Sequence, residues 1–354
     1  MEETKKRSRL GFWISTSLAI FFFLLSVVLL FTIIGLLIIK GAFLSDVEEG
    51  KIRKLVEVVI EGTGTDKITI IPVKGIITAQ PSKKLLYETQ SLVDSVKKQL
   101  EQARDDDDVK AVILEIDSPG GGITASDIIY KEILDFKEKT KKKVIVSMQD
   151  VAASGAYYIS ANADKIVSHP TTITGSIGVI MPLINIADLV KKYGIEDISV
   201  KSGAMKDIGS PLKKMSNEEQ EVLHSIVDEM YTRFLKIISE GRNMAIEDVR
   251  KLADGRIYTG RQALDNGLVD QLGYIEDAIA VAKEMAGLKE ATIIKYKEAF
   301  TLAEIFSGTM NDLFGNRTIK IDINTLPLGG DSPRFMYLWM GYQQHYIFKY
   351  PTFN

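Results

Sequence analysis

The sequence contains no cysteine. Without a thiol, the chain cannot use a cysteine nucleophile, hold a metal through thiolates or build a disulfide framework. This absence does not fix the compartment, because an exported protein can fold without disulfides. Histidine is also scarce: the 354 residues include three. A formal net charge of -3 leaves no large excess of either sign and so indicates no polyanionic partner such as a nucleic acid.

Charge is missing altogether from residues 11–39. A helix of that length, rising about 1.5 Å per residue, exceeds the ~30 Å hydrocarbon core of a bilayer. A cleavable signal peptide has an apolar region of only about 7–15 residues, so we predict an uncleaved anchor in membrane lipid. Lysine and arginine are equally numerous just before and just after this run, and their count sets no orientation. We predict a cytoplasmic N-terminus, because a short basic leader usually stays in the cytoplasm.

Apolar runs typical of buried strands alternate with segments of helical periodicity after residue 65. We expect strands at 67–77, 109–117, 143–150 and 165–169, and helices at 85–108, 124–139, 154–163, 216–240 (closed by Gly241) and 275–287. This alternation predicts an α/β domain with a largely parallel sheet, flanking helices and right-handed crossovers. The predicted organisation is a leader (1–10), a transmembrane anchor (11–39), a connector (40–64), the α/β domain (65–287) and a C-terminal extension with an aromatic tail (288–354).

Two glycine-rich segments follow neighbouring strands of this sheet, "DSPGGG" at 117–122 and "AASGAYY" at 152–158. Open α/β sheets place their binding sites at such strand ends. The glycines of the first segment permit backbone angles closed to other residues, which suits an anion or an extended peptide. Neither a GxxxxGK[ST] nor a GxGxxG spacing is present, so no nucleotide site is indicated. The second segment admits two interpretations: close packing of a helix on the sheet, or Ser154 as a nucleophile that a substrate backbone approaches closely.

A serine nucleophile needs a base to accept its proton. The histidines are poor candidates, because His169 lies in a turn, His224 in an amphipathic helix and His345 in the aromatic tail. A Ser-His-Asp triad is therefore disfavoured.

A lysine can replace histidine where burial lowers its pKa from ~10.4 towards neutrality. The segment 200–216 offers Lys201, Lys206, Lys213 and Lys214. The last two adjoin the polar start of a helix and are expected to be solvated, whereas Lys206 is the better buried candidate. Spacing alone does not separate Lys206 from Lys201.

Five segments together resemble signal peptide peptidase A, a family of bacterial serine–lysine membrane peptidases: "DSPGGG", "AASGAYYISANADKI", "TGSIGVI", "VKSGAMKDIGSP" and "ADGRIYTGRQALDNGLVDQLG". The match covers residues 65–285 in order, and the chain looks like the short, single-domain form. The resemblance implies the fold of the Clp protease and crotonase group. It also implies a homo-oligomer in the bacterial cell membrane, with the catalytic domain outside the cytoplasm and no metal or other cofactor.

The same resemblance implies roles for individual residues. Ser154 matches the nucleophile, Lys206 the general base and proton donor, and Ser176 the hydroxyl that orients the lysine amine. The oxyanion hole is expected from the N–H groups of Gly155 and of a glycine in 120–122, with Gly121 as the choice. The implied activity is a serine endopeptidase acting on signal peptide remnants and other apolar segments.

Two alternatives stay open at this point. A crotonase-like hydratase or other acyl-transfer enzyme also uses paired backbone N–H groups, although it would not need Ser154 and Lys206 together. A non-catalytic membrane scaffold would be expected to lack one of those two residues, and both are present. The aromatic tail admits two placements, packing on a neighbouring subunit or lying in a substrate groove, and we expect packing.

Overall fold

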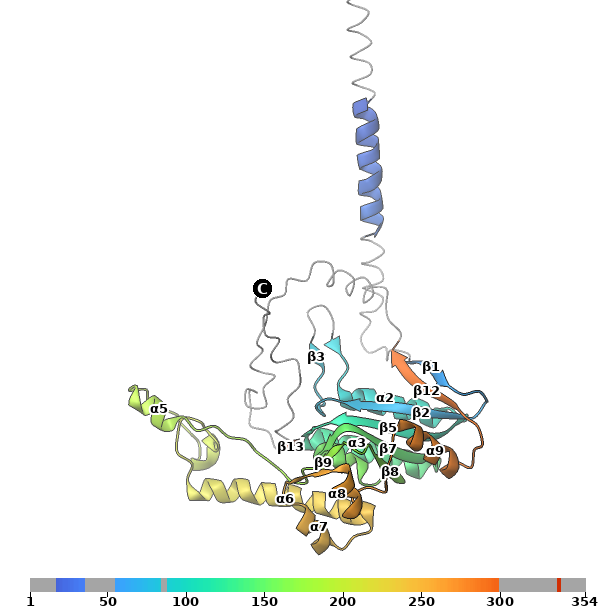
Figure 1. The fold of residues 1–354 in the computed structure, drawn as a ribbon. Helices are drawn as coiled ribbons and strands as arrows, with labels where there is room; N and C mark the ends of the chain where they lie inside the picture. The colour runs from blue at the N-terminus through green and yellow to red at the C-terminus, as the bar shows by residue number, and fades with distance from the viewer. Residues whose placement is uncertain (1–16, 36–54, 84–87, 299–335, 339–354) are drawn as a thin grey trace, which may run out of the picture. The chain divides into compact units, whose positions relative to one another are not determined.

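The computed structural model describes residues 17–35, 55–83, 88–298 and 336–338 (Figure 1). The chain divides into two compact units, and the larger one contains Leu55–Lys297. In the other unit the described part is the helix Ser17–Gly35, whose mean hydropathy of 2.9 makes it long and apolar enough to cross a membrane. Such a helix suits a membrane anchor or a signal sequence. The predicted leader 1–10 lies outside the described residues.

The larger unit is built on a mostly parallel sheet, which has nine strands in the described residues. Seven strands follow the order β1-β12-β2-β5-β7-β8-β11, while β9 pairs with β7 and β10. Pairing between β9 and β10 is antiparallel, whereas β2, β5, β7 and β8 run parallel to one another. The strands are β1 (Leu55–Glu61), β2 (Lys67–Lys74), β5 (Val109–Ser118), β7 (Lys143–Ala153), β8 (Lys165–Ser168), β9 (Ile173–Gly175), β10 (Ile257–Thr259), β11 (Gln271–Leu272) and β12 (Thr292–Glu298).

Helices cover both faces of this sheet because its central strands are apolar on both sides. One core cluster joins alternate side chains of β5 and β7 to the helices α2, α3, α4 and α6, and a second joins the other face to α9. The helices are α2 (Leu92–Asp105), α3 (Ile123–Thr140), α4 (Gly155–Ser160), α5 (Ala187–Lys192), α6 (Asn217–Arg242), α7 (Ile246–Leu252), α8 (Gly260–Asp265) and α9 (Ile275–Met285), with a 3-10 helix η1 (Ala204–Asp207). The predicted fold class is confirmed.

Several element boundaries differ from the sequence prediction. Helix α2 begins at Leu92, because the Ser91 side chain caps it by accepting a hydrogen bond from the Asp94 N–H at 3.1 Å. Strands β1 and β12 extend the sheet beyond the predicted bounds of 65–287, with β12 parallel to β2. Gly241 does not close helix α6, which continues to Arg242 and has Asn243 as its C-cap in a left-handed conformation. A Cβ on Gly241 would overlap the Ala161 carbonyl oxygen, so close approach of two backbones explains this glycine.

Three short strands complete the larger unit. β3 (Ser82–Lys83) and β4 (Glu88–Thr89) pair with each other. β6 (Gly120–Gly122) follows β5 directly and pairs with β13 (Met336–Leu338), a strand from the far end of the chain. The end of β7 and the start of α4 lie beside this pair, so the two glycine-rich segments meet at one edge of the fold.

Candidate active site

Ser154 occupies the sharp turn between β7 and α4. Its backbone has φ 54° and ψ -113°, a conformation that costs a non-glycine residue about 1–3 kcal/mol. The surroundings hold it there: the Ser154 N–H donates to the Gly175 carbonyl at 2.8 Å, and the Ser154 carbonyl accepts from the Tyr158 N–H at 2.9 Å. Enzymes of the α/β-hydrolase fold present a serine nucleophile on a strained strand-to-helix turn of this kind.

A pocket of about 240 Å³ opens beside Ser154. It is lined by Ser154, Ser176, Gly178, Val179, Ile180, Gly255 and Leu338. Ser176 also has a left-handed backbone, with φ 48°, and its N–H donates to the Arg256 carbonyl at 2.7 Å. Two serines in this rarely populated conformation therefore face one pocket, and such strain persists where the surrounding structure enforces it.

The backbones of both glycine-rich segments approach each other closely beside this pocket. A Cβ on Gly120, whose φ is 96°, would lie 2.6 Å from the Gly155 amide nitrogen, and one on Gly155 would lie 3.2 Å from the Gly121 amide nitrogen. Gly155 is the first residue of α4, so its N–H has no partner within the helix. Larger residues at these positions would separate the two segments.

The Gly121 N–H points away from the body of the sheet. On the body side, the Gly120 carbonyl accepts from the Ile77 N–H at 2.8 Å, and the Gly122 N–H donates to the Ile77 carbonyl at 2.9 Å. Because backbone groups alternate in direction along a strand, the N–H and carbonyl of Gly121 face the opposite side. The structure thus brings together four of the predicted site residues: Ser154, Ser176, Gly155 and Gly121.

Strand β13 lies in the groove between these glycines and residue 180. Its register pairs Tyr337 with Gly121, and on its other edge Met336 and Ile180 exchange two backbone hydrogen bonds of 2.9 and 3.0 Å. The Tyr337 carbonyl oxygen lies against Gly120 and 3.1 Å from the position a Cβ on Gly155 would take. The described part of the aromatic tail therefore pairs with two segments of its own chain beside the Ser154 pocket.

Comparison with known proteins identifies the family. The model of the family described as "Peptidase family S49" matches residues 136–289. The chain is 43% identical over 245 residues to the "Putative signal peptide peptidase SppA" of Enterococcus faecium, an alignment that covers 69% of this chain and 71% of that protein. The chain belongs to peptidase family S49. The resemblance predicted from the five segments is confirmed, and with it the Clp protease and crotonase type of fold.

Two other relatives are longer than this S49 chain. It is 36% identical over 217 residues to "Protease 4" of Salmonella typhi, covering 61% of this chain and 35% of that protein. It is 33% identical over 263 residues to "Serine protease SPPA, chloroplastic" of Arabidopsis thaliana, covering 73% of this chain and 39% of that protein. These alignments support a peptidase, and each covers less than half of the longer relative.

Lys206 lies on η1 and is exposed, so the burial predicted for it is not found within this S49 protomer. It is not among the residues that line the Ser154 pocket. The other three lysines of 200–216 are held by carboxylates: Lys201 and Lys213 each lie 2.6 Å from Asp207, and Lys214 lies 3.1 Å from Asp188. Among the described residues, the Lys206 amine has no carboxylate partner.

These ion pairs distinguish Lys206 from the other candidate bases, which the spacing of the lysines in the sequence does not do. Hydrogen bonds from Lys201 and Lys213 lower the pKa of Asp207 to about 2, and the carboxylates of Asp207 and Glu219 raise the pKa of Lys213. A carboxylate partner favours the charged form of a lysine and opposes its use as a base. Lys206, which lacks such a partner in the described part of the chain, is favoured over Lys201.

The histidines do not lie where a base for Ser154 would have to be, as far as the structure describes them. His169 Nδ1 lies 2.8 Å from the Thr171 hydroxyl, and its ring meets Tyr274 edge-on at 4.8 Å. His224 is exposed on α6, and His345 lies outside the described residues. No described histidine lines the Ser154 pocket. The residues described in the structure also contain no cluster of three or more His, Cys, Asp or Glu side chains that could hold a metal ion.

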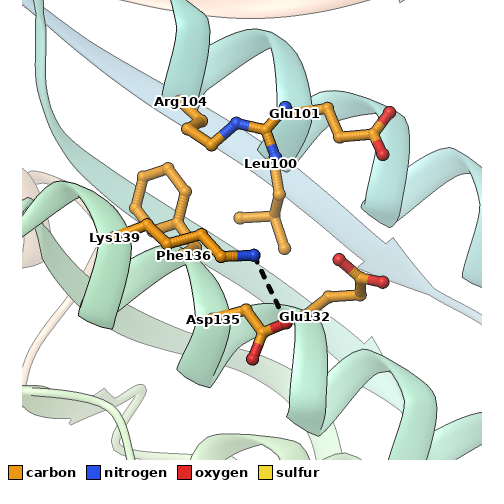
Figure 2. A pocket seen from close by; sticks show the side chains of 7 residues that line it. All are labelled: Leu100, Glu101, Arg104, Glu132, Asp135, Phe136 and Lys139. Atoms are coloured by element: carbon orange, nitrogen blue, oxygen red, sulfur yellow. Dashed lines mark ion pairs between the residues drawn. The ribbon is translucent and has the colours of Figure 1, made fainter.

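Figure 2 shows a second hollow, on the outer surface between α2 and α3. It is lined by Leu100, Glu101, Arg104, Glu132, Asp135, Phe136 and Lys139. Lys139 pairs with Asp135 at 3.6 Å, one turn away on the same helix α3. Its volume of about 20 Å³ is close to what one water molecule needs, so the hollow is too small for a peptide or cofactor.

Proposed function

We propose that this S49 peptidase is a membrane-anchored serine endopeptidase that uses Ser154 as nucleophile and Lys206 as base. The observation that carries the proposal is the position of the Tyr337 carbonyl, which lies beside Gly155 and on the Gly121 side of β6, next to Ser154. A peptide bound as β13 is bound would present a backbone carbonyl to the serine. Strand addition of this kind fixes the backbone of a peptide through main-chain hydrogen bonds.

The chemistry then follows from the arrangement. Neutral Lys206 accepts the Ser154 proton, and the Ser154 oxygen attacks the peptide carbonyl to form a tetrahedral intermediate. The N–H groups of Gly155 and Gly121 hold the oxyanion, and one such donor typically contributes about 3–4 kcal/mol to the barrier reduction. Lys206 returns the proton to the leaving amine, and water hydrolyses the acyl-enzyme by the same route. Ser176 orients the lysine amine, and the sequence of steps requires no metal or cofactor.

Lys206 reaches Ser154 from a second copy of the chain in this proposal. The segment that carries Lys206 exposes an unusual number of large apolar side chains: Ile184, Leu189, Tyr193, Ile195, Ile198 and Val200. In Figure 1, α5 of this segment lies apart from the sheet of its own unit. Exposed apolar surface of this extent is typical of an interface. A homo-oligomer would cover it and would place the amine of one copy in the pocket of another.

The helix Ser17–Gly35 is the proposed anchor, with the N-terminus in the cytoplasm and the catalytic domain outside. Within the helix, the hydroxyls of Ser26 and Thr32 donate to backbone carbonyls three residues back, each at 2.7 Å, so both are satisfied without water. Anchoring brings the active site to the membrane face, where signal peptide remnants and other apolar segments are the proposed substrates.

The deciding experiment uses the full chain in detergent micelles with a fluorogenic apolar peptide. Ser154→Ala and Lys206→Ala should each reduce kcat by a factor of about 10³ or more. Lys214→Ala is the matched control, because that exposed lysine pairs only with exposed Asp188 among the described residues. Full activity in either site variant would overturn the dyad and would favour a scaffold or another chemistry on this fold.

A mixing experiment tests the shared site. Co-assembled Ser154→Ala and Lys206→Ala chains should regain a measurable part of the activity, because the first supplies a lysine to the serine of the second. If both residues acted within one chain, the mixture would stay inactive.

A further inference from the structure

Strands β5 and β7 fall out of register where the two glycine-rich segments begin. Ile116 pairs with Met148, and the next pair joins Ser118 to Ala152. Between these pairs β5 has a single residue, whereas β7 has three, residues 149–151. The two extra residues form a bulge in β7. Bulges bend a strand and re-aim its end, and they are frequent beside active sites.

The bulge lets β7 exchange one neighbouring strand for another. Before it, residues 145–148 pair with β8, and after it residues 151–153 pair with β9. Ser154 follows directly, and its N–H donates to the carbonyl of Gly175 at the end of β9. The path of β7 through the bulge therefore determines where Ser154 lies.

Side chains hold the bulge on both sides. From β5, Asp117 Oδ1 accepts a hydrogen bond from the Val151 N–H at 3.3 Å. From the other side, the Thr172 hydroxyl donates to the Gln149 carbonyl at 2.5 Å. Val151 is 8% exposed, so its N–H depends on this acceptor rather than on bulk water. The two side chains replace ladder hydrogen bonds that the bulge interrupts.

Asp117 connects the two segments that meet at the active site. It begins the segment that leads to Gly121, and its carboxylate bonds to the residue three positions before Ser154. Its own backbone is fixed by the Gly75 N–H, which donates to the Asp117 carbonyl at 2.9 Å. Beyond this point the segments are in close contact, with the Gly121 amide nitrogen 3.2 Å from the position a Cβ on Gly155 would take. A displacement at the bulge would therefore change the spacing between Ser154 and Gly121.

We propose that Asp117 is a positioning residue of this peptidase: its carboxylate closes the bulge of β7 and so sets the place of Ser154 relative to the Gly121 N–H. This inference rests on the proposed function and adds a residue that acts through the nucleophile rather than on the substrate. Oxyanion donors are effective only where the tetrahedral oxygen will form, and a misplacement of about 1 Å can cost about 10²-fold in rate. Asp117 therefore affects kcat more than it affects the binding of an uncleaved peptide.

The surroundings of Asp117 call for a hydrogen-bond acceptor rather than for a negative charge. Burial raises the pKa of Asp117, and the carboxylates of Asp150 and Glu115 raise it further, while the Val151 N–H and Lys74 act in the opposite direction. The charged form is thus less favourable here than in water. An asparagine, whose amide oxygen can accept the same hydrogen bond, should replace this aspartate with little loss of activity.

The test compares two ligands of one apolar peptide sequence, bound by the full chain in micelles. One ends in a boronic acid, whose boron binds the Ser154 oxygen and becomes tetrahedral, as in the proposed intermediate. The other ends in a primary alcohol, which Ser154 cannot attack. The readout is the ratio of the two Kd values, because competition from β13 affects both equally and cancels. Asp117→Leu should lower kcat and the preference for the boronic acid by about 10²-fold each, with the Kd of the alcohol within a few-fold.

Three further variants sharpen the test. Asp117→Asn keeps the acceptor and should retain most of the kcat and of the preference. Thr172→Val removes the hydroxyl on the other side of the bulge with little change in volume, and it should act in the same direction as Asp117→Leu by a smaller factor. Glu115→Leu is the matched control: Glu115 lies on the same face of β5 and pairs with Lys74 and Lys295, each at 3.2 Å, so its loss should leave the ratio unchanged.

The outcomes separate this inference from the proposed function. An unchanged ratio in Asp117→Leu, or in Thr172→Val if the former does not fold, would overturn the inference alone. An equal loss of affinity for both ligands would do so as well, because the bulge would then serve folding only. A loss in Asp117→Asn as large as in Asp117→Leu would contradict the acceptor role. A preference for the boronic acid that persists in Ser154→Ala would instead overturn the proposed function on which the inference rests.

Discussion

Gly155→Ala tests whether this glycine serves packing or catalysis. Its φ lies outside the left-handed region, so alanine is not strained by backbone conformation and only the new methyl group matters. That methyl would lie 2.5 Å from Ser126 Oγ and 3.1 Å from the Tyr337 carbonyl oxygen, which marks the proposed position of the substrate carbonyl. We expect two separate effects: overpacking against Ser126 and obstruction of the proposed oxyanion hole.

The first effect lowers the stability of the fold, and the second lowers kcat. Overpacking of a buried site costs about 1–3 kcal/mol, which corresponds to a fall in Tm of roughly 5 °C for a domain of this size. Obstructing one oxyanion donor should lower kcat by about 10²–10³. Ser126 Oγ is buried with no hydrogen-bond partner among the described residues, so Ser126→Ala alone should be harmless.

The double variant Gly155→Ala with Ser126→Ala separates these effects. Removing Oγ relieves the closer contact, so Tm should recover most of the loss, measured by thermal melting of the chain in micelles. The methyl group still faces the carbonyl position, so kcat should stay low. Recovery of full activity in the double variant would refute the reasoning and would show that Gly155 is needed for packing alone.

Three further predictions concern the tail and two ion pairs. A chain that ends before Met336 should cleave short peptides with kcat/KM about 10-fold higher or more, since the groove is vacated; an unchanged value would show that β13 does not occupy the substrate's place. Because the pKa of Asp207 is lowered to about 2, its stabilising effect is complete above the unfolded pKa of about 3.9 and lost as pH falls through about 2. The Tm difference between Asp207→Asn and the unmodified chain should therefore shrink between these pH values, and a constant difference would contradict the assignment. Asp270→Ala leaves Arg242 unpaired at 8% side-chain exposure and should lower the unfolding free energy by about 3 kcal/mol in a urea titration, whereas a loss below 1 kcal/mol would show that water replaces the pair.

The central sheet and the turn at Ser154 could be predicted because their signals are local. β5 and β7 are continuous apolar runs buried on both faces, and the small residues 152–156 mark the point where a strand gives way to a tightly packed helix. The family resemblance supplied the role of Ser176, which no spacing argument assigns. Its place in the Ser154 pocket agrees with that role without testing it.

The features that could not be predicted from the sequence depend on contacts between residues that are far apart in the chain. Nothing in the pattern around Tyr337 indicates that its backbone pairs with Gly121, since strand pairing is set by the whole fold rather than by the strand itself. Likewise, no local pattern predicts that Tyr158 on α4 and Arg233 on α6 both donate hydrogen bonds to Asp127 on α3, because these helices are far apart in the sequence. Strand β1 was missed because its side chains are mostly exposed, so it lacks the apolar run of the central strands.

Strand β13 is bonded along both of its edges, to residue 121 on one side and to Ile180 on the other. A substrate held in this manner must offer both edges of its backbone at once. A helix has none to offer, and a strand within a sheet has at most one free. The groove would therefore distinguish unfolded from folded chains by their hydrogen-bonding state alone, and the proposed membrane-anchored protease would spare the folded proteins around it.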